Sequence, residues 1–401
     1  MPTTAAPPPP SFTARVSRIS VSATAAVVIE AEKLRAAGRD LVDFGAGEPD
    51  FATPAHIKQA AVQALEENFT RYTSTGGIAP LKDAIRQSHD RDFHSGYGRE
   101  EVLVTCGGKH ALFNAISALI GHGDEVILPA PYWVSFRDQI CYAGGTPVIG
   151  PTDEAAGFTL TLEAITARLT PRTRMILLNS PANPSGAVFS PQLFRGVLEV
   201  CRERGIWLLS DECYSKFVYQ GQPYSAATDA AQLPGAKERL IIAGSFSKTY
   251  AMTGWRLGYL LAPAAVIQQA VKLQSHSTSN PTSFVQKGGI AALSGPQEPV
   301  REMLAEYTRR RALIVAGLRA IPGIRCTEPA GAFYAYPNIT GVMAKKGIAT
   351  PLEFANRLLQ HSGVVTVPGE AFGTDQHLRF SYATSQATIR QGLDRLAAFC
   401  A

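Results

Sequence analysis

Residues 240–261 read LIIAGSFSKTYAMTGWRLGYLL, and the architecture expected for the rest of the chain follows from this segment. Its first four residues are apolar throughout, which is typical of a β-strand buried on both faces of a sheet. A second short apolar run closes the segment at 258–261. Between the two runs, small and hydroxyl-bearing residues surround Lys248 and precede Arg256. The segment therefore predicts two strands joined by a polar loop that carries two cations.

Short apolar runs of the same kind recur along the chain and alternate with helical patterns. The predicted strands are residues 102–105, 125–128, 147–149, 175–179, 207–210, 240–243 and 258–261. The predicted helices between them are residues 110–120, 162–167 and 191–203. Alternation of this kind predicts a mostly parallel, seven-stranded sheet covered by helices, which makes the fold class α/β.

The pattern changes after about residue 299. A long helical pattern over residues 300–320 ends at Ile321-Pro322-Gly323. Strand-like runs follow at 332–336 and 378–382, with helical patterns at 351–361 and 386–399. This part of the chain predicts a smaller α+β unit.

The composition narrows the class of protein. The 401 residues suggest two or three domains at about 150 residues per domain. Charged residues make up 18%, below the usual figure of about 25%, which indicates a large buried interior or an extensive subunit interface. The 38 basic and 33 acidic residues leave a net charge of +5 without a clustered basic footprint, so we expect no nucleic-acid partner.

Short features exclude other classes. The longest apolar run, residues 257–267, is far shorter than the ~18 residues of a membrane-spanning helix, so we expect no membrane partner. The six cysteines are scattered without C-x-x-C spacing, so we expect no metal site and no disulfide framework. The N-terminus, MPTTAAPPPP, lacks the basic and apolar regions of a secretory signal, which predicts a cytoplasmic protein. Its prolines predict a disordered, extended tail over residues 1–14.

Two polar residues stand where α/β folds place functional groups. Lys248 directly follows a predicted buried strand. Alone, it could be a solvated loop lysine beside a salt-bridging arginine. Asp211, in the segment LLSDECY at 208–214, stands at the carboxyl end of another predicted strand. A capping role is the structural alternative for this carboxylate.

Two segments rich in glycine and proline also follow predicted strands. The segment NSPANPSG at 179–186 suits a structural turn, and we expect cis peptide bonds at Asn183–Pro184 and Ala130–Pro131. In TCGGKHAL at 105–112, two glycines precede a predicted helix. Glycines at a helix N-terminus let backbone N–H groups approach a phosphate, although a plain tight turn has the same composition.

Taken in order and with their spacing, these segments resemble the class I aminotransferases that depend on pyridoxal phosphate (PLP). The resemblance runs from about residue 15 to the C-terminus. It implies a PLP-dependent transferase of fold type I whose large domain spans residues 47–308. Residues 15–46 and 309–401 would form a small, discontinuous domain. The resemblance also implies a homodimer whose active sites are shared between the subunits.

The resemblance gives each segment a role. Lys248 would bind the aldehyde of PLP covalently, Asp211 would face the pyridine nitrogen, and Tyr214 would hydrogen-bond the phenolic oxygen. These three are the implied catalytic residues. The implied cofactor-binding residues are Tyr72 (from the other subunit), Gly107, Gly108, Lys109, Trp133, Asn183, Asp211, Tyr214, Ser245, Ser247, Lys248 and Arg256. Ala182 and Ser185 depart mildly from the family pattern.

Several of these residues also have a plain structural interpretation. Without the resemblance, Tyr214 and Trp133 would be core aromatics and Tyr72 a loop tyrosine. Lys109 could be a solvated or phosphate-proximal lysine. Each functional role therefore depends on the whole set of segments.

The resemblance also implies the substrate contacts. Arg379, in HLRFSYAT at 377–384, would bind the α-carboxylate, which suits a planar guanidinium; an arginine on the polar face of an edge strand is the alternative. Lys109, Ser22 and Thr24 match residues with which a bacterial subgroup of aspartate aminotransferases reads the distal carboxylate. The segment 274–281 has no arginine for that task. The implied substrate-binding residues are Ser22, Thr24, Gly47, Lys109, Trp133, Asn183 and Arg379.

The implied reaction moves an amino group between an L-amino acid, with aspartate expected, and 2-oxoglutarate by a ping-pong mechanism. The partners are these small molecules and a second copy of the chain. An aromatic, alanine or kynurenine aminotransferase and a PLP-dependent C–S lyase stay open as alternatives. A non-catalytic regulator would carry an added DNA-binding domain, for which we expect no room before about residue 15.

Overall fold

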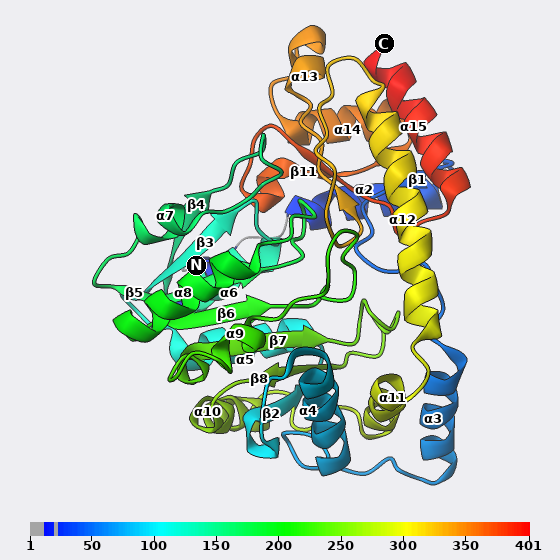
Figure 1. Cartoon of the computed structure of the whole chain (residues 1–401). Helices are drawn as coiled ribbons and strands as arrows, with labels where there is room; N and C mark the ends of the chain where they lie inside the picture. Colours follow the sequence, from blue (N-terminus) through cyan, green and yellow to red (C-terminus); the bar gives the residue numbers. More distant parts are fainter. Residues whose placement is uncertain (1–11, 20–22) are drawn as a thin grey trace, which may run out of the picture.

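The computed structural model describes residues 12–19 and 23–401 of the chain. Its centre is a seven-stranded sheet with strand order β2-β8-β7-β6-β5-β3-β4 (Figure 1). The strands are β2 (Val102–Thr105), β3 (Glu125–Ala130), β4 (Thr146–Pro151), β5 (Thr173–Asn179), β6 (Trp207–Asp211), β7 (Leu240–Ser245) and β8 (Gly258–Leu261). Within this sheet only β8 runs antiparallel to its neighbours, β2 and β7. The predicted seven strands and the mostly parallel α/β sheet are confirmed.

The strands are apolar because helices cover both faces of the sheet. On one face lie α5 (Gly108–Leu119), α6 (Val134–Ala143) and α10 (Ala264–Ser275). On the other face lie α4 (Ala79–Phe93), α7 (Leu162–Thr166), α8 (Pro191–Arg204) and α9 (Ala226–Ala230). Successive strand residues point to opposite faces, so in β6 Leu208 joins the core under α8 while Leu209 joins the core under α5.

Local sequence signals set the ends of helix α8. The side chain of Ser190 accepts a hydrogen bond from the backbone N–H of Leu193 at 3.2 Å, and Pro191 occupies the first helical turn. Gly205 ends the helix with a φ of 69°, a left-handed conformation that glycine adopts without a Cβ clash. The chain then enters β6, whose last residue is Asp211.

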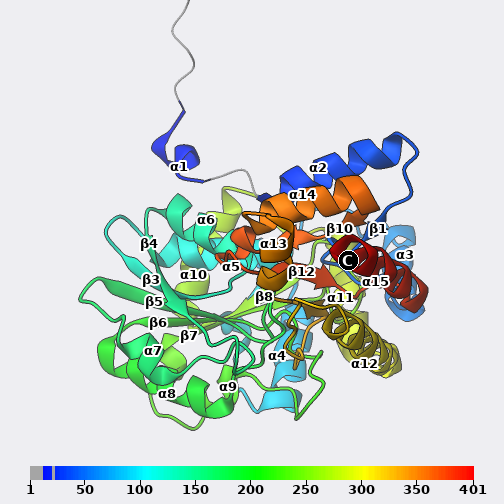
Figure 2. The same cartoon turned by 90° about the horizontal axis from the view of Figure 1, so that it is seen from above.

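A second group of elements lies at one end of the sheet (Figures 1 and 2). We call it the small unit. It contains β1 (Val42–Asp43), β9 (Tyr334–Ala335), β10 (Val364–Val365), β11 (Val367–Pro368), β12 (Leu378–Ser381), α2 (Ala23–Ala36), α13 (Thr340–Lys346), α14 (Pro351–Ser362) and α15 (Gln386–Cys400). Strand order is β11-β12-β9 in one sheet and β1-β10 in the other.

The small unit joins distant parts of the chain. Strand β1 pairs in parallel with β10, so that Val42 lies opposite Val364. The long helix α12 (Glu298–Arg319) runs from the level of the large sheet to the small unit, where it packs against α15 (Figure 1). The domain bounds 15–46, 47–308 and 309–401 stay a prediction.

Three further helices of the described residues are α1 (Ala14–Ser17), α3 (Ala55–Glu66) and α11 (Ser283–Ser294). Short 3-10 turns occur at Arg99–Glu101, Lys237–Arg239 and Gly369–Phe372. Residues 1–11 of the predicted proline-rich tail lie outside the described residues. In the part of the chain that the structure describes, no helix combines the length and the apolar character needed to cross a membrane.

Two of the differences from the predicted elements have a clear physical cause. The strand expected at 332–336 is reduced to the two residues of β9, because Ala332 adopts a left-handed φ of 55° that breaks the extended backbone. Helix α11 was not predicted. It contains Gly288 and Gly289, and a Cβ at these positions would lie 2.7 Å from the ring of Trp255 and 2.6 Å from Leu257. Close packing therefore selects glycine in a helix that propensity disfavours.

The peptide bonds Ala130–Pro131 and Asn183–Pro184 are cis, which confirms the expectation from the sequence. The bond Ser180–Pro181 is also cis.

The two-sided core makes a stability prediction. Leu208→Ala removes a fully buried side chain from β6, and we expect it to lower the free energy of unfolding by about 2–5 kcal/mol. Leu352→Ala, at an exposed position of α14, should change it by less than about 0.5 kcal/mol. Urea denaturation followed by circular dichroism measures both. Equal losses in the two variants would contradict the buried placement of β6.

Candidate active site

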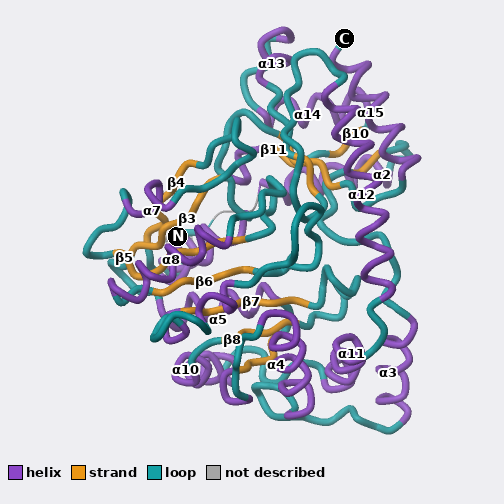
Figure 3. Tube along the Cα trace, in the orientation of Figure 1, coloured by secondary structure: helices purple, strands orange, loops and turns teal. Residues whose placement is uncertain are grey.

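A cavity of about 490 Å³ lies where the carboxyl ends of β5, β6 and β7 meet the small unit. Figure 3 shows the loop segments that fill the region between the sheet and the small unit. The predicted residues that line this cavity are Gly47, Gly108, Lys109, Trp133, Asn183, Asp211, Tyr214, Ser245, Ser247, Lys248, Arg256 and Arg379. Eight lining residues had no predicted role: Gly45, Ala46, Leu112, Val134, Asn179, Cys213, Gly244 and Tyr334.

Lys248 enters the cavity from the turn after β7. Its Nζ donates a hydrogen bond to the backbone oxygen of Gly47. Burial lowers the pKa of this amine, and the nearby guanidinium groups of Arg379 and Arg256 lower it further, while Cys213 and Glu48 oppose the shift. A lysine with a lowered pKa carries more of the neutral amine at neutral pH, which makes it a nucleophile for a carbonyl group and a base.

Asp211 forms the floor of the cavity at the end of β6. Its Oδ1 accepts a hydrogen bond from the backbone N–H of Cys213 at 3.0 Å. Burial raises the pKa of Asp211 to about 7, and the neighbouring Glu212 adds to the shift, while Lys248 opposes it. A carboxylate in this setting is stabilised strongly by a cationic partner placed against it.

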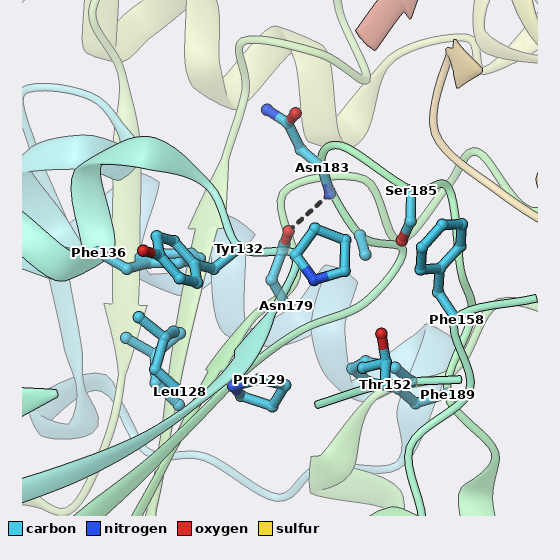
Figure 4. Close-up of a pocket in the computed structure, with 13 residues that line it drawn as sticks. Leu128, Pro129, Tyr132, Phe136, Thr152, Phe158, Asn179, Asn183, Ser185 and Phe189 are labelled. Carbon is cyan, nitrogen blue, oxygen red and sulfur yellow. Dashed lines mark hydrogen bonds between the residues drawn. The ribbon is translucent and has the colours of Figure 1, made fainter. Parts of the chain in front are cut away.

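Asn179 contacts two other residues that line the cavity, and Figure 4 shows its hydrogen bond with Asn183. Its side-chain amide donates to the backbone oxygen of Asp211 at 3.1 Å, and its Oδ1 accepts from the backbone N–H of Asn183 at 2.9 Å. The sequence shows that Asn179 ends a predicted apolar strand but not what it contacts; in the folded sheet it lies directly beside Asp211. Asn179 thus fixes the position of Asn183 relative to Asp211.

A second, smaller cavity of about 20 Å³ lies next to Asn179 and Asn183. Figure 4 shows aromatic side chains around it, among them Tyr132, Phe136 and Phe158. A volume of this size holds about one water molecule. It is therefore too small for a substrate, and the reaction belongs in the larger cavity.

Glycines shape one wall of the large cavity into an anion site. Gly107 has a φ of 88° and Gly108 begins helix α5. A Cβ on Gly107 would lie 2.5 Å from Nη2 of Arg256, and one on Gly108 would lie 3.1 Å from Cβ of Ser245. The glycines therefore bring a helix N-terminus, a guanidinium and a hydroxyl together, a combination that binds phosphate. Gly107 shapes this turn but does not itself line the cavity.

Lys109 adds a third cation beside the anion site. Burial lowers the pKa of Lys109, and the charge of Arg256 lowers it further. Its Nζ lies 5.0 Å from the centre of the Trp133 ring, and both residues line the cavity. The lysine is therefore placed to meet an anionic group inside the cavity.

Arg379 reaches the cavity from β12 of the small unit. Its Nη1 donates to Oδ1 of Asn183 at 3.1 Å and its Nη2 donates to the backbone oxygen of Gly45 at 2.7 Å. Nη1 and Nη2 each carry a second N–H that none of the hydrogen bonds among the described residues uses. A desolvated guanidinium that keeps a free donor is a binding site for a carboxylate.

Three predicted residues are not brought into the cavity by the described chain. Tyr72 is 91% exposed and is absent from the cavity lining. Ser22 lies outside the described residues, and so does the side chain of Thr24, whose backbone belongs to α2.

The cavity suits two small molecules of defined chemistry. Its volume lies within the range of about 300–1,000 Å³ typical of small-molecule sites. The glycine turn with Arg256 fits a phosphate, Lys248 an aldehyde, and Asp211 a cationic ring nitrogen. The free donor of Arg379 fits the carboxylate of an amino acid. The residues present therefore fit a phosphorylated pyridine aldehyde together with an amino acid.

Comparison with known proteins agrees with this chemistry. The family model described as aminotransferase class I and II matches residues 39–396. The chain is 42% identical to an aspartate aminotransferase of Geobacillus stearothermophilus, with 96% of this chain and 98% of the relative covered. It is 42% identical to an aspartate/prephenate aminotransferase of Cereibacter sphaeroides, covering 96% and 98%. The crystal structure of an aspartate aminotransferase from Rhizobium meliloti superposes with a TM-score of 0.92 at 42% identity, covering 97% and 98%.

The raised pKa of Asp211 predicts a pH-dependent stability in protein stripped of bound small molecules. The folded state holds the proton up to about pH 7, whereas the unfolded chain releases it near pH 3.9, so stability falls as pH rises between these values. Asp211→Asn does not titrate. We expect it to gain about 2–3 kcal/mol relative to the wild type between pH 5 and pH 8.

Urea denaturation at the two pH values measures this difference. Asp394→Asn, at an exposed position on α15, is the control, and its difference in stability from the wild type should be the same at both pH values. A stability difference for Asp211→Asn that is the same at both pH values would contradict the burial argument.

Proposed function

The chain belongs to the class I and II aminotransferases, and from this premise we propose that it uses pyridoxal 5′-phosphate to move the amino group of aspartate to 2-oxoglutarate. One observation carries the proposal. Lys248 from the turn after β7, Asp211 from β6 and Arg379 from β12 all line a single cavity. The names of the relatives support aspartate as the donor.

Residues of the cavity would hold the cofactor at four places. The phosphate would lie against Arg256, Ser245 and the N-terminus of α5, with Ser247 beside them. Asp211 would pair with the ring nitrogen. The phenolic oxygen would take hydrogen bonds from Tyr214 and Asn183, and Trp133 would cover one face of the ring. PLP supplies an aldehyde for the amino group and an electron-accepting ring.

Lys248 performs two tasks in this proposal. Its amine would hold the aldehyde of the cofactor, and as a free amine it would be the base that removes the proton from the substrate Cα. Its lowered pKa serves both tasks, because the neutral amine is the reactive form. Asp211 and Tyr214 support this proton transfer by holding the ring in its electron-accepting state.

Two cations would bind the two carboxylates of aspartate. Arg379 would take the α-carboxylate with the remaining N–H groups of Nη1 and Nη2, while Asn183 and Gly45 hold the guanidinium in place. Lys109 would take the distal carboxylate from the opposite wall, next to Trp133. Ser22 and Thr24 keep their proposed place in this second site, and the backbone of Gly47 would lie beside the substrate.

The active enzyme is proposed to be a homodimer with shared active sites. Tyr72 follows α3, on which Val62 and Leu65 are also exposed. Exposed apolar side chains gathered on one element indicate a contact surface. Tyr72 would enter the partner's cavity and reach the phosphate there.

A cytoplasmic location completes the proposal. The six cysteines all lie among the described residues and are free thiols. Free thiols are usual in reducing compartments.

Replacing Lys248 tests the chemistry. Lys248→Ala should still bind PLP through Arg256 and Asp211. Its transamination rate should fall by about a hundredfold to ten-thousandfold, because the base is absent. Stopped-flow half-reactions with aspartate measure the rate, and absorbance after gel filtration measures retained PLP. Lys345→Ala, at an exposed lysine on α13 that does not line the cavity, is the control and should react normally. Near-normal turnover by Lys248→Ala would contradict the proposal.

Replacing Lys109 tests the substrate. In half-reactions of the wild type, aspartate and glutamate should react faster than alanine or phenylalanine. Lys109→Ala should lower the kcat/KM for aspartate by about 10- to 100-fold, since a charge-assisted hydrogen bond contributes about 1.5–3 kcal/mol, and should leave alanine nearly unchanged.

The same assays separate the open alternatives. An aromatic or alanine preference in the wild type would overturn aspartate specificity and leave the aminotransferase intact. Pyruvate and ammonia released from a β-substituted amino acid would indicate a C–S lyase. Parallel double-reciprocal plots with 2-oxoglutarate support transamination.

A further inference from the structure

A second tyrosine stands behind Tyr214 in the cavity wall. Tyr334 lies in β9 of the small unit and is fully buried, and it lines the same cavity. Its hydroxyl oxygen lies 2.7 Å from the hydroxyl oxygen of Tyr214. Its ring centre lies 4.7 Å from the guanidinium carbon of Arg379. Tyr334 therefore contacts both Tyr214, which is proposed to bind the cofactor, and Arg379, which is proposed to bind the substrate.

We propose that Tyr334 is a positioning residue that acts on both halves at once. Its hydroxyl strengthens the hydrogen bond that Tyr214 donates to the phenolic oxygen of the cofactor, and its ring holds the plane of Arg379 for the substrate carboxylate. This proposal rests on the proposed function and deepens it.

The direction of the hydroxyl pair follows from counting donors. A phenol has one proton to donate. Burial raises the pKa of Tyr214 and of Tyr334, so both stay protonated at neutral pH. Within residues 12–19 and 23–401, Tyr214 is the only hydrogen-bond partner of the Tyr334 hydroxyl. When Tyr214 donates outward to the cofactor, Tyr334 donates to Tyr214.

A donated hydrogen bond makes the receiving hydroxyl a better donor in turn. Such chains strengthen each bond by about 10–30% in condensed phases. A stronger bond from Tyr214 stabilises the phenolic oxygen in its anionic form. Tyr334 should therefore lower the pH at which the bound cofactor loses its proton.

The ring of Tyr334 acts on Arg379 by stacking. The guanidinium carbon also lies 5.1 Å from the ring centre of Phe372. Its in-plane donors bind Asn183 and Gly45. These two ring contacts and two hydrogen bonds leave the guanidinium little freedom to turn. Its remaining N–H groups therefore keep a fixed direction toward the substrate carboxylate. Cation–π contacts are stronger where the cation is desolvated, as it is here.

The loop that carries Gly47 closes over both contacts. A Cβ on Gly47 would lie 3.2 Å from the Tyr334 hydroxyl and 3.9 Å from Nη2 of Arg379. The same residue accepts the hydrogen bond from Lys248. The Tyr334 hydroxyl thus lies among residues that line the cavity, unlike the hydroxyl of an ordinary core tyrosine.

The chain offers a matched control elsewhere in the small unit. Tyr382 donates to Tyr219 at 3.2 Å and is also fully buried, but neither residue lines the cavity. Tyr382→Phe therefore removes the same atom from a similar buried pair without reaching the site.

The test uses the PLP-loaded enzyme and the pH midpoint of its visible absorption change. Tyr334→Phe should raise the midpoint by about half a pH unit, and Tyr214→Phe should raise it more. The double variant should match Tyr214→Phe alone, because Tyr334 acts through Tyr214. Tyr382→Phe should not shift it. An unshifted midpoint in Tyr334→Phe would overturn the proposal. A double variant whose midpoint exceeds that of Tyr214→Phe by the full Tyr334→Phe shift would also overturn it.

The ring is tested with succinate, a non-reacting dicarboxylate, titrated against the same absorption. Tyr334→Phe keeps the ring and should bind succinate within about twofold of the wild type, whereas Tyr334→Leu should bind it about tenfold more weakly. Equal weakening in both variants would contradict a role for the ring. Wild-type enzyme that fails to bind PLP or to transaminate refutes the proposed function, whereas normal wild type with an unshifted Tyr334→Phe refutes only the inference.

Discussion

Desolvation of charged groups at the carboxyl edge of a parallel sheet is the constraint on which the site depends. Lys248, Arg256, Arg379 and Lys109 share one cavity, and their charges repel one another. Backbone oxygens hold three of them in place: Gly47 for Lys248, Thr253 for Arg256 and Gly45 for Arg379. Arg379 is buried and Lys248 is partly buried, and desolvating cations is costly, so the excess of cations favours the binding of anionic ligands. The same desolvation sets the pKa of Lys248 and of Asp211 in the directions that the chemistry uses.

The site is assembled from parts of the chain that meet only in the folded protein. The large sheet contributes Lys248, Asp211 and Asn183 from the ends of neighbouring strands. The small unit contributes Arg379 and Tyr334 on strands that pair with each other. The backbone at 45–47 lies between them. Movement of the small unit relative to the sheet would therefore change substrate binding and the environment of Tyr214 together.

Much of this could be predicted from the sequence, for physical reasons. Strands buried on both faces are continuous apolar runs, so β5, β6 and β7 were evident, and polar residues at their carboxyl ends meet at one edge. Asn179 and Tyr334 were missed because their importance lies in tertiary contacts, to Asn183 and Asp211 in one case and to Tyr214 and Arg379 in the other. The shortening of β9 follows from the backbone at Ala332, which no periodicity reveals.

Chemical trapping tests most directly that Lys248 is the residue that binds an aldehyde cofactor. PLP-loaded enzyme is reduced with borohydride, digested, and mapped by peptide mass spectrometry. At one equivalent of PLP per chain, the added pyridoxyl-phosphate mass should appear only on the peptide that contains Lys248. A label on Lys109 or on surface lysines, with Lys248 unmodified, would contradict the assignment of the site.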